Sequence, residues 1–352
     1  MFELDELQYY PVNWTDGMRV TAKDFARSDR AWMDALRDVR ASLFQGTQYG
    51  LLPPLRDSSD KSPYPKINYE PARSLITLQE CRAITEGGYR IEITEALHRN
   101  SQVPLHLPKA RLDKQEDCEI YVSVDLFAPQ GAGLMTTDAP PRHQFISPFY
   151  ELSVLPKSDG VGLSGFNHLK IAEYKWVRGH FERDEQYIPS CLTMTAHAAL
   201  SDRFLKAGSY LKTIHDNSIH IVRQYRSDPR PDVKDAALWI EKLVLFISGS
   251  LWSYNDTLIN ESPAKVIVYF KNFGQYVLST TDCYEANLFM KDGARSQRQL
   301  FKDLADPNFN TDDLRTAFNR IDVALKGMHV WLKALAESFK QGRVIKVEEI
   351  RN

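Results

Sequence analysis

Residues 200–225, LSDRFLKAGSYLKTIHDNSIHIVRQY, decide the class of fold. Apolar or small side chains recur there in alternating steps of four and three: Leu200, Phe204, Ala207, Leu211, Ile214, Ser218, Ile221 and Tyr225. This spacing is the heptad pattern of a long helix that packs against other helices along one seam. The pattern ends at the DPRP stretch of residues 228–231, because proline cannot continue a helix.

The rest of the C-terminal part predicts more long helices. A second seam, which includes Ile240, Val244 and Ile247, runs as far as Leu258. Ser262 followed by Pro263 predicts the start of a third helix, because proline favours the first helical position. A last helix is expected from Thr311 to about Gly342, with Ile321 in its seam. We therefore expect a helical bundle over residues 192–342 and a tail over 343–352, while residues 288–304 either continue the third helix or form a separate one.

The last predicted helix carries more apolar surface than one seam needs. Phe318, Leu325, Leu332 and Phe339 form a second stripe beside its heptad residues. Two interpretations stay open: the stripe widens the core of a single chain, or it packs against other copies of the chain.

The first half of the chain has a different pattern. Short apolar runs, bounded by glycine, proline and aspartate, occur at 75–78, 89–93, 119–126, 150–155 and 169–172. Runs of this kind predict an antiparallel sandwich or barrel over residues 1–190, of which we expect the β-sandwich, with a hairpin turn at Gly87 and Gly88. The chain as a whole is therefore expected to be an α+β protein with two parts.

One helix is expected within the first half, at about residues 21–45. Thr21 is a good N-cap and Asp24 stands where a capping box needs an acceptor. Apolar residues at helical spacing follow, namely Phe25, Trp32, Leu36, Val39 and Leu43. Just before this helix, Asp16 and Gly17 form the dipeptide most typical of a β-hairpin turn.

Composition and charge argue against several classes of protein. The chain has 44 Lys and Arg against 46 Asp and Glu, a net charge of −2, so no basic field favours nucleic acid or an anionic membrane surface. The four cysteines are isolated, which disfavours a zinc site or a secreted disulfide scaffold. With no signal-peptide pattern and no long uncharged apolar run, the expectation is a cytoplasmic protein without direct membrane insertion.

Motifs for catalysis and for cofactor binding are also missing from the sequence. There is no P-loop and no G-x-S-x-G serine motif, and His215 and His220 stand five apart, which separates them on a helix. Cys191 is interpreted as a buried small apolar residue and not as a reactive thiol. We therefore expect a protein that is not an enzyme, with no catalytic residue, cofactor or metal.

Two motifs resemble a known family. Trp14-Thr-Asp-Gly-Met18 is similar to the W-x-E-G-M opening of TssK, a baseplate protein of type VI secretion systems, and Phe25 matches a phenylalanine in the following segment. Residues 184–192, DEQYIPSCL, resemble the D-x-x-F/Y-I-P-P-C-L segment of that family. The layout matches over essentially the whole chain, although the matching residues are confined to these two stretches.

The resemblance implies a homotrimer with a β-rich shoulder, similar to that of phage receptor-binding proteins, and a helical neck. It implies that the shoulder binds baseplate wedge proteins of the TssG and TssF type. The wedge-facing residues would be Trp14, Asp16, Gly17, Met18 and Phe25, and the domain junction would be Ile188, Pro189, Cys191 and Leu192. It favours contact between copies through the stripe of the last helix. Family members typically continue into a C-terminal head domain, so the sequence is expected to be a short form whose membrane-side partner is unknown.

Other interpretations remain open at this stage. A trimeric, phage-like receptor-binding protein that recognises a cell surface would have the same layout. A β-sandwich hydrolase would need two carboxylates that converge in one pocket. Trp14 and Phe25 could also be ordinary core residues, with Gly17 serving only the turn.

Overall fold

The structure is a computed structural model, and it describes residues 4–44, 48–55, 63–94, 107–112, 114–159, 163, 165–283, 297–306 and 313–340. The chain divides into two compact units, Met1–His197 and Ala198–Asn352, which we call the sheet unit and the helical unit. It combines α-helices with antiparallel sheets, so the predicted α+β class is confirmed. The expected tail over 343–352 lies outside the described residues.

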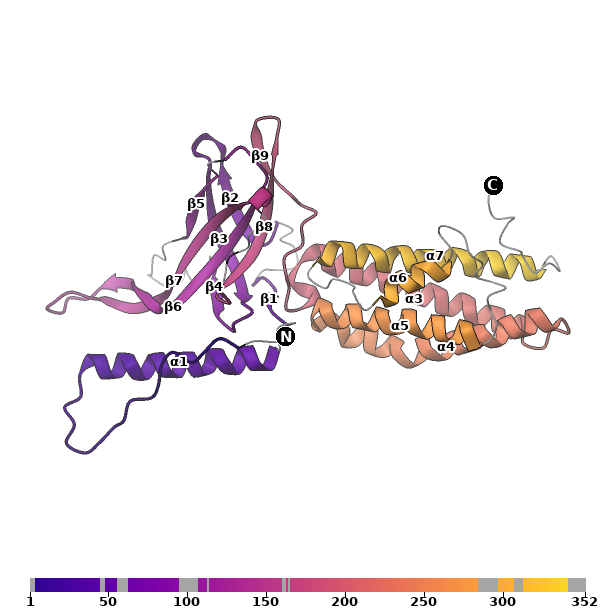
Figure 1. Ribbon diagram of the computed structural model, residues 1–352, viewed down its shortest axis with the longest axis horizontal. Helices are drawn as coiled ribbons and strands as arrows, with labels where there is room; N and C mark the ends of the chain where they lie inside the picture. Colours follow the sequence, from indigo (N-terminus) through magenta and orange to yellow (C-terminus); the bar gives the residue numbers. More distant parts are fainter. Residues whose placement is uncertain are drawn as a thin grey trace. The chain divides into compact units, whose positions relative to one another are not determined.

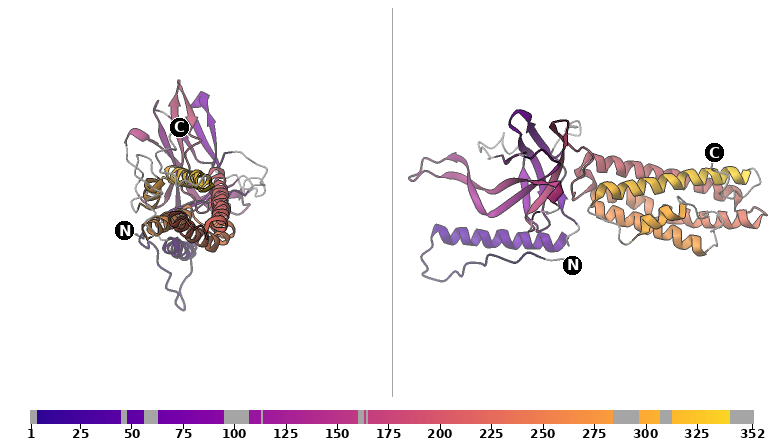
Figure 2. Two further views of the ribbon diagram at one scale, coloured as in Figure 1. Left: turned by 90° about the vertical axis from the view of Figure 1, so that its right-hand side faces the viewer. Right: turned by 45° about the horizontal axis from the view of Figure 1, so that its top comes forward.

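The sheet unit contains two antiparallel sheets (Figures 1 and 2). In the first sheet, β3 (Leu75–Ile84) pairs with β1 (Gly50–Leu51), β2 (Lys66–Glu70), β4 (Arg90–Ile93) and β5 (Lys109–Arg111). The second sheet has the order β7 (His143–Pro156), β6 (Cys118–Met135), β8 (His168–Val177) and β9 (His180–Arg183). The short apolar runs of the sequence fall in β3, β4, β6, β7 and β8, which confirms those predicted strands.

Side chains from the two sheets contact one another. The Tyr69 ring of β2 lies 6.0 Å from Tyr174 of β8 and 6.3 Å from Phe181 of β9, measured between ring centroids. The Glu92 amide of β4 donates a 3.3 Å hydrogen bond to the Tyr150 hydroxyl of β7. Buried aliphatic residues on the strands, including Ile76, Leu78, Ile91, Ile120, Val122 and Ile171, form the core of the unit.

The predicted turn between β3 and β4 is confirmed. The Gly88 amide donates a 3.0 Å hydrogen bond to the Thr85 carbonyl, and Gly88 has a φ of +80°. A β-carbon at Gly88 would lie 2.2 Å from the Arg37 carbonyl oxygen of the early helix α1 (Ala22–Phe44). Glycine at this position therefore serves both the turn and the close approach of α1 to the sheet.

The helical unit consists of α3 (Ala198–Tyr225), α4 (Pro231–Asp256), α5 (Pro263–Cys283), α6 (Gln297–Ala305) and α7 (Leu314–Lys340) among the described residues. Short 3₁₀ turns occur at Leu258–Asn260 here and at Pro71–Arg73, Lys157–Asp159 and Met194–Ala196 in the sheet unit. Helix α3 packs against α4 and α7, and α6 packs against α5 and α7 (Figure 1). The uncertain segment 288–304 includes the separate helix α6, and residues 288–296 lie outside the described part.

Aromatic contacts hold the long helices together. Tyr254 of α4 stacks on Phe204 of α3 with centroids 4.3 Å apart, and its hydroxyl donates a 2.7 Å hydrogen bond to the Phe204 carbonyl. Trp239 of α4 meets Trp331 of α7 edge to face at 5.4 Å. The predicted seam residues Leu200, Phe204, Leu211, Ile214, Ile240, Ile247 and Ile321 are buried in this core, and Val244 is half-buried.

The second stripe of the last helix is buried within the single chain. Phe318, Leu325, Leu332 and Phe339 are each at most 2% exposed. The expectation that these residues face other copies is therefore wrong, and the wider core of one chain is the correct alternative. The physical reason is that α7 is covered on two sides, because α3 and α6 both pack against it.

Helix α4 is long and apolar enough to cross a membrane by length and composition, and it is the one such helix among the described residues. No such segment was expected from the sequence. Part of its apolar surface contacts three other helices: Phe204 of α3, Trp331 of α7 and Phe273 of α5 all contact aromatic rings of α4, and 33% of the most apolar window is buried. A core helix satisfies the same criterion, so its composition alone is weak evidence for a membrane span.

Candidate interaction surface

The residues singled out at the N-terminus form a turn and an exposed aromatic pair. The Met18 amide donates a 3.2 Å hydrogen bond to the Thr15 carbonyl, and Gly17 has a φ of +78°. The predicted hairpin is wrong, because residues 4–21 form no strand: a turn dipeptide needs paired flanking segments to make a hairpin. Asp16 and Gly17 are exposed, and Met18 is half-buried.

Trp14 and Phe25 lie together at the start of α1. Their ring centroids are 6.1 Å apart, with an interplanar angle of 48°. Trp14 is 48% exposed and Phe25 is 61% exposed, so the alternative that they are ordinary core residues is wrong for the single chain. Each covers part of the other and leaves the rest accessible to a partner.

The start of α1 is defined by the predicted capping box. Oδ2 of Asp24 accepts hydrogen bonds from the Thr21 amide at 2.9 Å and from the Thr21 hydroxyl at 2.7 Å. These bonds hold the pKa of the Asp24 carboxyl below its usual value. The helix therefore begins at Ala22, as the sequence indicates.

The inner face of α1 is polar and buried. The Arg37 Nε donates a 2.8 Å hydrogen bond to Oδ1 of Asp34, and both side chains have no exposed area. Oδ2 of Asp34 accepts hydrogen bonds from the amides of Gln8 and Tyr9, at 2.5 and 3.0 Å. The Arg37 guanidinium also donates to the carbonyls of Asp5 and Glu6. This cluster fastens the N-terminal segment to α1 and turns the polar face of the helix inward.

Tyr89 extends the same cluster to the sheet. Its hydroxyl donates a 2.9 Å hydrogen bond to Asp5, and its ring lies 5.4 Å from the Arg37 guanidinium carbon. Burial, helped by the Asp5 carboxylate, raises the pKa of Tyr89 well above its ordinary value, so the phenol stays neutral. Asp34 and Arg37 were not predicted from the sequence as buried residues. The sequence does show two opposite charges three residues apart, which predicts an ion pair on a helix. Such pairs are usually exposed, so this spacing did not predict a buried one.

The outer face of α1 is apolar and exposed. Its large side chains and exposed fractions are Phe25 (61%), Trp32 (70%), Leu36 (53%), Val39 (52%) and Leu43 (69%). These are the residues whose spacing predicted the helix. A contiguous apolar strip of this kind on a helix indicates a protein–protein contact, and we call these five residues the α1 seam.

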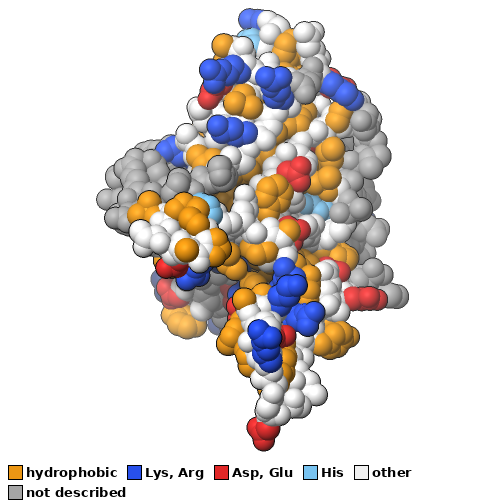
Figure 3. Space-filling model, turned by 90° about the vertical axis from the view of Figure 1, so that its left-hand side faces the viewer, with side chains coloured by type: hydrophobic (Ala, Val, Ile, Leu, Met, Phe, Trp, Pro, Cys, Tyr) orange, Lys and Arg blue, Asp and Glu red, His pale blue; other side chains and the backbone are white. Residues whose placement is uncertain are grey.

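A second exposed apolar area lies at the end of the β6–β7 hairpin, which extends away from the rest of the sheet (Figure 1). Its large exposed side chains are Leu134, Met135, Phe145, Ile146 and Phe149. Figure 3 views the molecule from this side and shows hydrophobic side chains exposed on this face. These residues were not predicted from the sequence, because alternation along a strand does not reveal which face stays uncovered.

The second motif, residues 184–192, is held by backbone hydrogen bonds to Leu51 of β1. The Leu51 amide donates to the Ser190 carbonyl and the Leu192 amide donates to the Leu51 carbonyl, both at 2.8 Å. Ile188, Pro189 and Cys191 are buried, and Leu192 is half-buried. Burial raises the pKa of the Cys191 thiol well above its ordinary value, which agrees with an unreactive buried residue.

This anchoring places the end of the motif in the sheet unit. The compact units divide after His197, so residues 192–197 group with the sheets and not with the expected helical part. Burial lowers the pKa of His197 to about 4, with a further contribution from Arg183. His197 is therefore neutral near pH 7 and a weak base.

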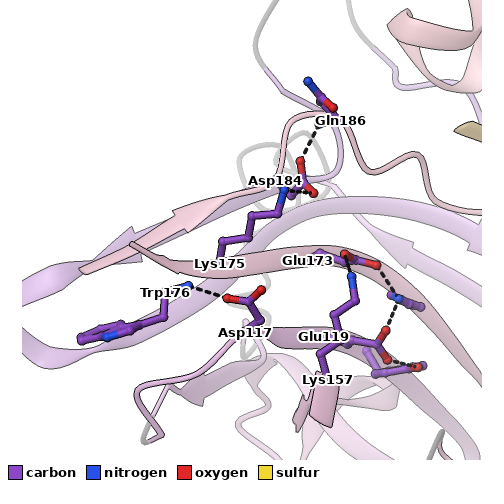
Figure 4. A network of polar contacts seen from close by, with 10 residues as sticks. Asp117, Glu119, Lys157, Glu173, Lys175, Trp176, Asp184 and Gln186 are labelled. Atoms are coloured by element: carbon purple, nitrogen blue, oxygen red, sulfur yellow. Dashed lines mark hydrogen bonds and ion pairs between the residues drawn. The ribbon is translucent and has the colours of Figure 1, made fainter. Parts of the chain in front are cut away.

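Carboxylates converge at one place on the second sheet (Figure 4). Glu119 of β6 and Glu173 of β8 are paired across the strands, and both bind the Lys170 ammonium. Lys157 adds a 2.6 Å ion pair to Glu173, and the Tyr121 hydroxyl donates a 2.8 Å hydrogen bond to Glu119. Nearby, Asp184 pairs with Lys175 at 2.8 Å.

Glu173 does not have the electrostatics of a general acid. Burial by itself raises the pKa of Glu173, but hydrogen bonds from Lys157 and Lys170 outweigh it and the pKa is lowered. A general acid of a glycosidase needs a raised pKa. Among the described residues, no group of three or more His, Cys, Asp or Glu side chains could hold a metal ion. The arrangement ties β6 and β8 to the 3₁₀ turn that follows β7 through charge pairs.

Acid is expected to weaken this network. A carboxyl whose pKa is lower in the folded state stabilises the fold above its unfolded pKa, near 4.5 for Glu173, and that contribution is lost as the pH falls through the folded pKa. We expect Glu173→Gln to lower the thermal midpoint at pH 7 and to flatten its decline between about pH 5 and pH 3. Glu182→Gln is the matched control, since Glu182 is exposed and pairs only with the exposed His180 among the described residues. Equal slopes in the two variants would contradict the prediction.

Comparison with known proteins shows similarity of structure and not of sequence. No protein-family model matches the chain, and no curated protein matches it. A crystal structure of TssK matches with a TM-score of 0.59 and 13% identity, covering 91% of this chain and 69% of the other. TssK of the EAEC type VI secretion system, in complex with a nanobody, matches with a TM-score of 0.54 and 12% identity over 86% and 99% of the two chains.

TssK within a TssK–TssF–TssG baseplate subcomplex gives a TM-score of 0.55 and 12% identity, covering 92% of this chain and all of the other. The matches span both the sheet unit and the helical unit. The chain therefore has a TssK-like fold.

Proposed function

We propose that this chain is a non-enzymatic adaptor of a type VI secretion, or contractile injection, baseplate. Similarity to TssK over at least 86% of the chain supports this proposal, because it includes both units in the same order. In this proposal the sheet unit is a sandwich-like shoulder and the helical unit is a bundled neck. The protein acts in the cytoplasm, holds other proteins in place, and neither binds nucleic acid nor inserts directly into a membrane.

The proposed partners are wedge proteins of the TssF and TssG type, bound through the shoulder, and further copies of the chain in a homotrimer. The solved assembly of TssK with TssF and TssG supports the first part. The exposed α1 seam supports the second part, because it is apolar surface that the described residues of one chain leave uncovered. The neck would extend the complex towards a membrane-side component of unknown identity.

The proposal is tested by co-expressing the chain with the TssF-type and TssG-type proteins of its own host. We expect the three to co-purify through size exclusion at a constant ratio. Retention on cell envelopes without wedge proteins would overturn the proposal and support the phage-like receptor-binding alternative.

Trp14→Ala is expected to weaken wedge co-purification by about tenfold or more, because exposed tryptophans are frequent hot spots of interfaces. The thermal midpoint should change little, since about half of the Trp14 side chain is already exposed. Trp252→Ala is the control, as Trp252 is 71% exposed on α4 of the helical unit. Equal losses of binding and of thermal stability would mean that Trp14 acts through folding and would contradict a wedge-facing role.

A further inference from the structure

The α1 seam has the repeat of a coiled coil. Its members step from Trp32 to Leu36, Val39 and Leu43 by four, three and four residues, and Phe25 lies seven residues before Trp32. A strict repeat of about 3.5 residues produces a narrow seam that fits another helix, whereas a helix covering a globular core has a wider stripe. In heptad terms, Leu36 and Leu43 occupy a positions, and Phe25, Trp32 and Val39 occupy d positions.

The opposite face of the helix prevents the seam from turning inward. The buried residues of α1 are Asp24, Ala31, Asp34, Arg37 and Ala41, which all fall at b, c or f positions. The Asp34–Arg37 pair and its bonds to residues 5–9 hold that face, and Gly88 lets the backbone of α1 approach closely. Among the described residues of the sheet unit, none buries the seam, which stays exposed.

We propose that the α1 seam packs against the same seam of two other copies of this chain, forming a parallel three-helix coiled coil. The proposal rests on the homotrimer proposed above and assigns the surface that holds it together. The copies, and not a different protein, are the occupant for two reasons, which concern the flanking charges and the choice of core residues.

The residues that flank the seam are compatible with an identical helix. The g positions are Ser28, Ala35 and Ser42, and the e positions are Ala26, Met33 and Arg40. Flanking charges normally choose a partner of opposite charge. Here five of the six are small or uncharged, so identical helices meet without repulsion and no charged partner is favoured.

The core residues favour more than two helices. In parallel dimers, a β-branched residue at a with leucine at d is preferred. The aliphatic residues of the α1 seam have the reverse order, since Leu36 and Leu43 occupy a positions and Val39 occupies a d position. Leucine at a with a β-branched residue at d shifts the preference towards trimers or larger assemblies.

One polar residue interrupts the seam. Asp29 is exposed and occupies the a position between Phe25 and Trp32. A polar residue at a single a position fixes the register of a coiled coil at a cost in stability. We infer that the Asp29 layer keeps the association weaker than the aromatic layers beside it would allow, so that removing it strengthens the trimer.

Sedimentation of the full chain over a range of concentrations tests the proposal. We expect a trimer, and we expect Leu36→Glu to raise its dissociation constant by about 100-fold or more, because three carboxylates would enter one apolar layer. Leu205→Glu is the matched control, since Leu205 is also an exposed leucine within a long helix. Circular dichroism should be the same for both variants.

A gain of affinity gives an independent readout that misfolding cannot imitate. Asp29→Leu is expected to lower the dissociation constant by about tenfold or more. Asp202→Leu, which adds the same side chain at an exposed position of α3, should leave it unchanged. For the parallel arrangement, Leu43→Cys in a Cys283→Ser background should give a disulfide between copies on oxidation, and Leu205→Cys should give none.

The outcomes separate this proposal from the proposed function. A trimer that Leu36→Glu leaves equally tight would overturn the α1 seam while the homotrimer stands. A monomer at tens of micromolar would overturn both the seam and the homotrimer. A dimer that Leu36→Glu dissociates would overturn the three-helix arrangement.

Discussion

Arg37→Met lowers the free energy of unfolding of the sheet unit by about 3–5 kcal/mol, the expected loss when one partner of a buried ion pair is removed. The Asp34 carboxylate would stay buried without its cation, and the carbonyls of Asp5 and Glu6 would each lose a donor. One guanidinium nitrogen of Arg37 already lacks a partner among the described residues, so we expect a loss nearer to 3 kcal/mol. Chemical unfolding followed by circular dichroism measures it.

Two further variants isolate the cause of that loss. Arg27→Met removes an arginine from the same helix, but Arg27 is largely exposed and 3.9 Å from Asp24, so its cost should stay below about 1 kcal/mol. Adding Asp34→Asn to Arg37→Met removes the buried charge and keeps an acceptor for the amides of Gln8 and Tyr9. The double variant should regain part of the stability. If Arg37→Met costs no more than Arg27→Met, the pair does not hold the inner face of α1.

Gly88→Ala is expected to destabilise the sheet unit by about 2–5 kcal/mol, from two causes that add. A φ of +80° is strained for alanine, which costs about 1–2 kcal/mol. In addition, the new methyl group would lie 2.2 Å from the Arg37 carbonyl oxygen and 2.8 Å from the Ala41 amide nitrogen, both backbone atoms that cannot rotate away. Overpacking of this kind costs about 1–3 kcal/mol more.

Gly179→Ala separates these two causes. Gly179 has a similar φ of +90°, but no described atom lies within 4 Å of the position of its β-carbon. It should show the cost of backbone strain alone, about 1–2 kcal/mol. The difference between the two variants therefore measures how firmly α1 is packed on the β3–β4 turn. Equal losses would mean that α1 moves away from the turn without cost.

The two faces of α1 are linked by these results. Its polar face binds the N-terminal segment and contacts the β3–β4 turn, and its apolar face is left for a partner. If the inner face is loosened by Gly88→Ala, the seam should also lose its fixed position, and self-association should weaken. Leu36→Glu should weaken association without changing the stability of the sheet unit. Both variants should weaken association, but only Gly88→Ala should also lower the stability of the sheet unit, and this difference distinguishes a surface that folds the chain from one that joins copies.

Much of the architecture follows from the sequence because local spacing is enough to define it. Heptad steps define α3, α4 and α7, α3 ends just before the proline-containing stretch 228–231, and the hydrogen bonds of Thr21 with Asp24 start α1 where the residues indicate. Short apolar runs locate five of the strands. The capping box, the β3–β4 turn and the buried character of Cys191 were also predictable, since each depends on neighbours in the chain or on residue type.

The candidate surface was only partly predictable. The residues around Trp14 came from the resemblance to TssK, and the apolar spacing of α1 was visible, but the sequence did not show that this spacing faces outward. The hairpin expected at Asp16 and Gly17 is absent because no segment pairs across the turn. The stripe on α7 was favoured as the surface between copies, but α3 and α6 cover it within the single chain.

The sequence by itself determined that the chain has a β-rich part and a part of long helices, and that α1 is amphipathic. Only the tertiary structure decided which face of each helix meets the rest of the chain. The physical reason is that periodicity reports how apolar groups are spaced along a helix, while burial depends on what lies opposite them. On α7 the apolar residues face other helices of the same chain and are buried. On α1 the face that contains Asp34 and Arg37 is buried instead, so the apolar face stays exposed.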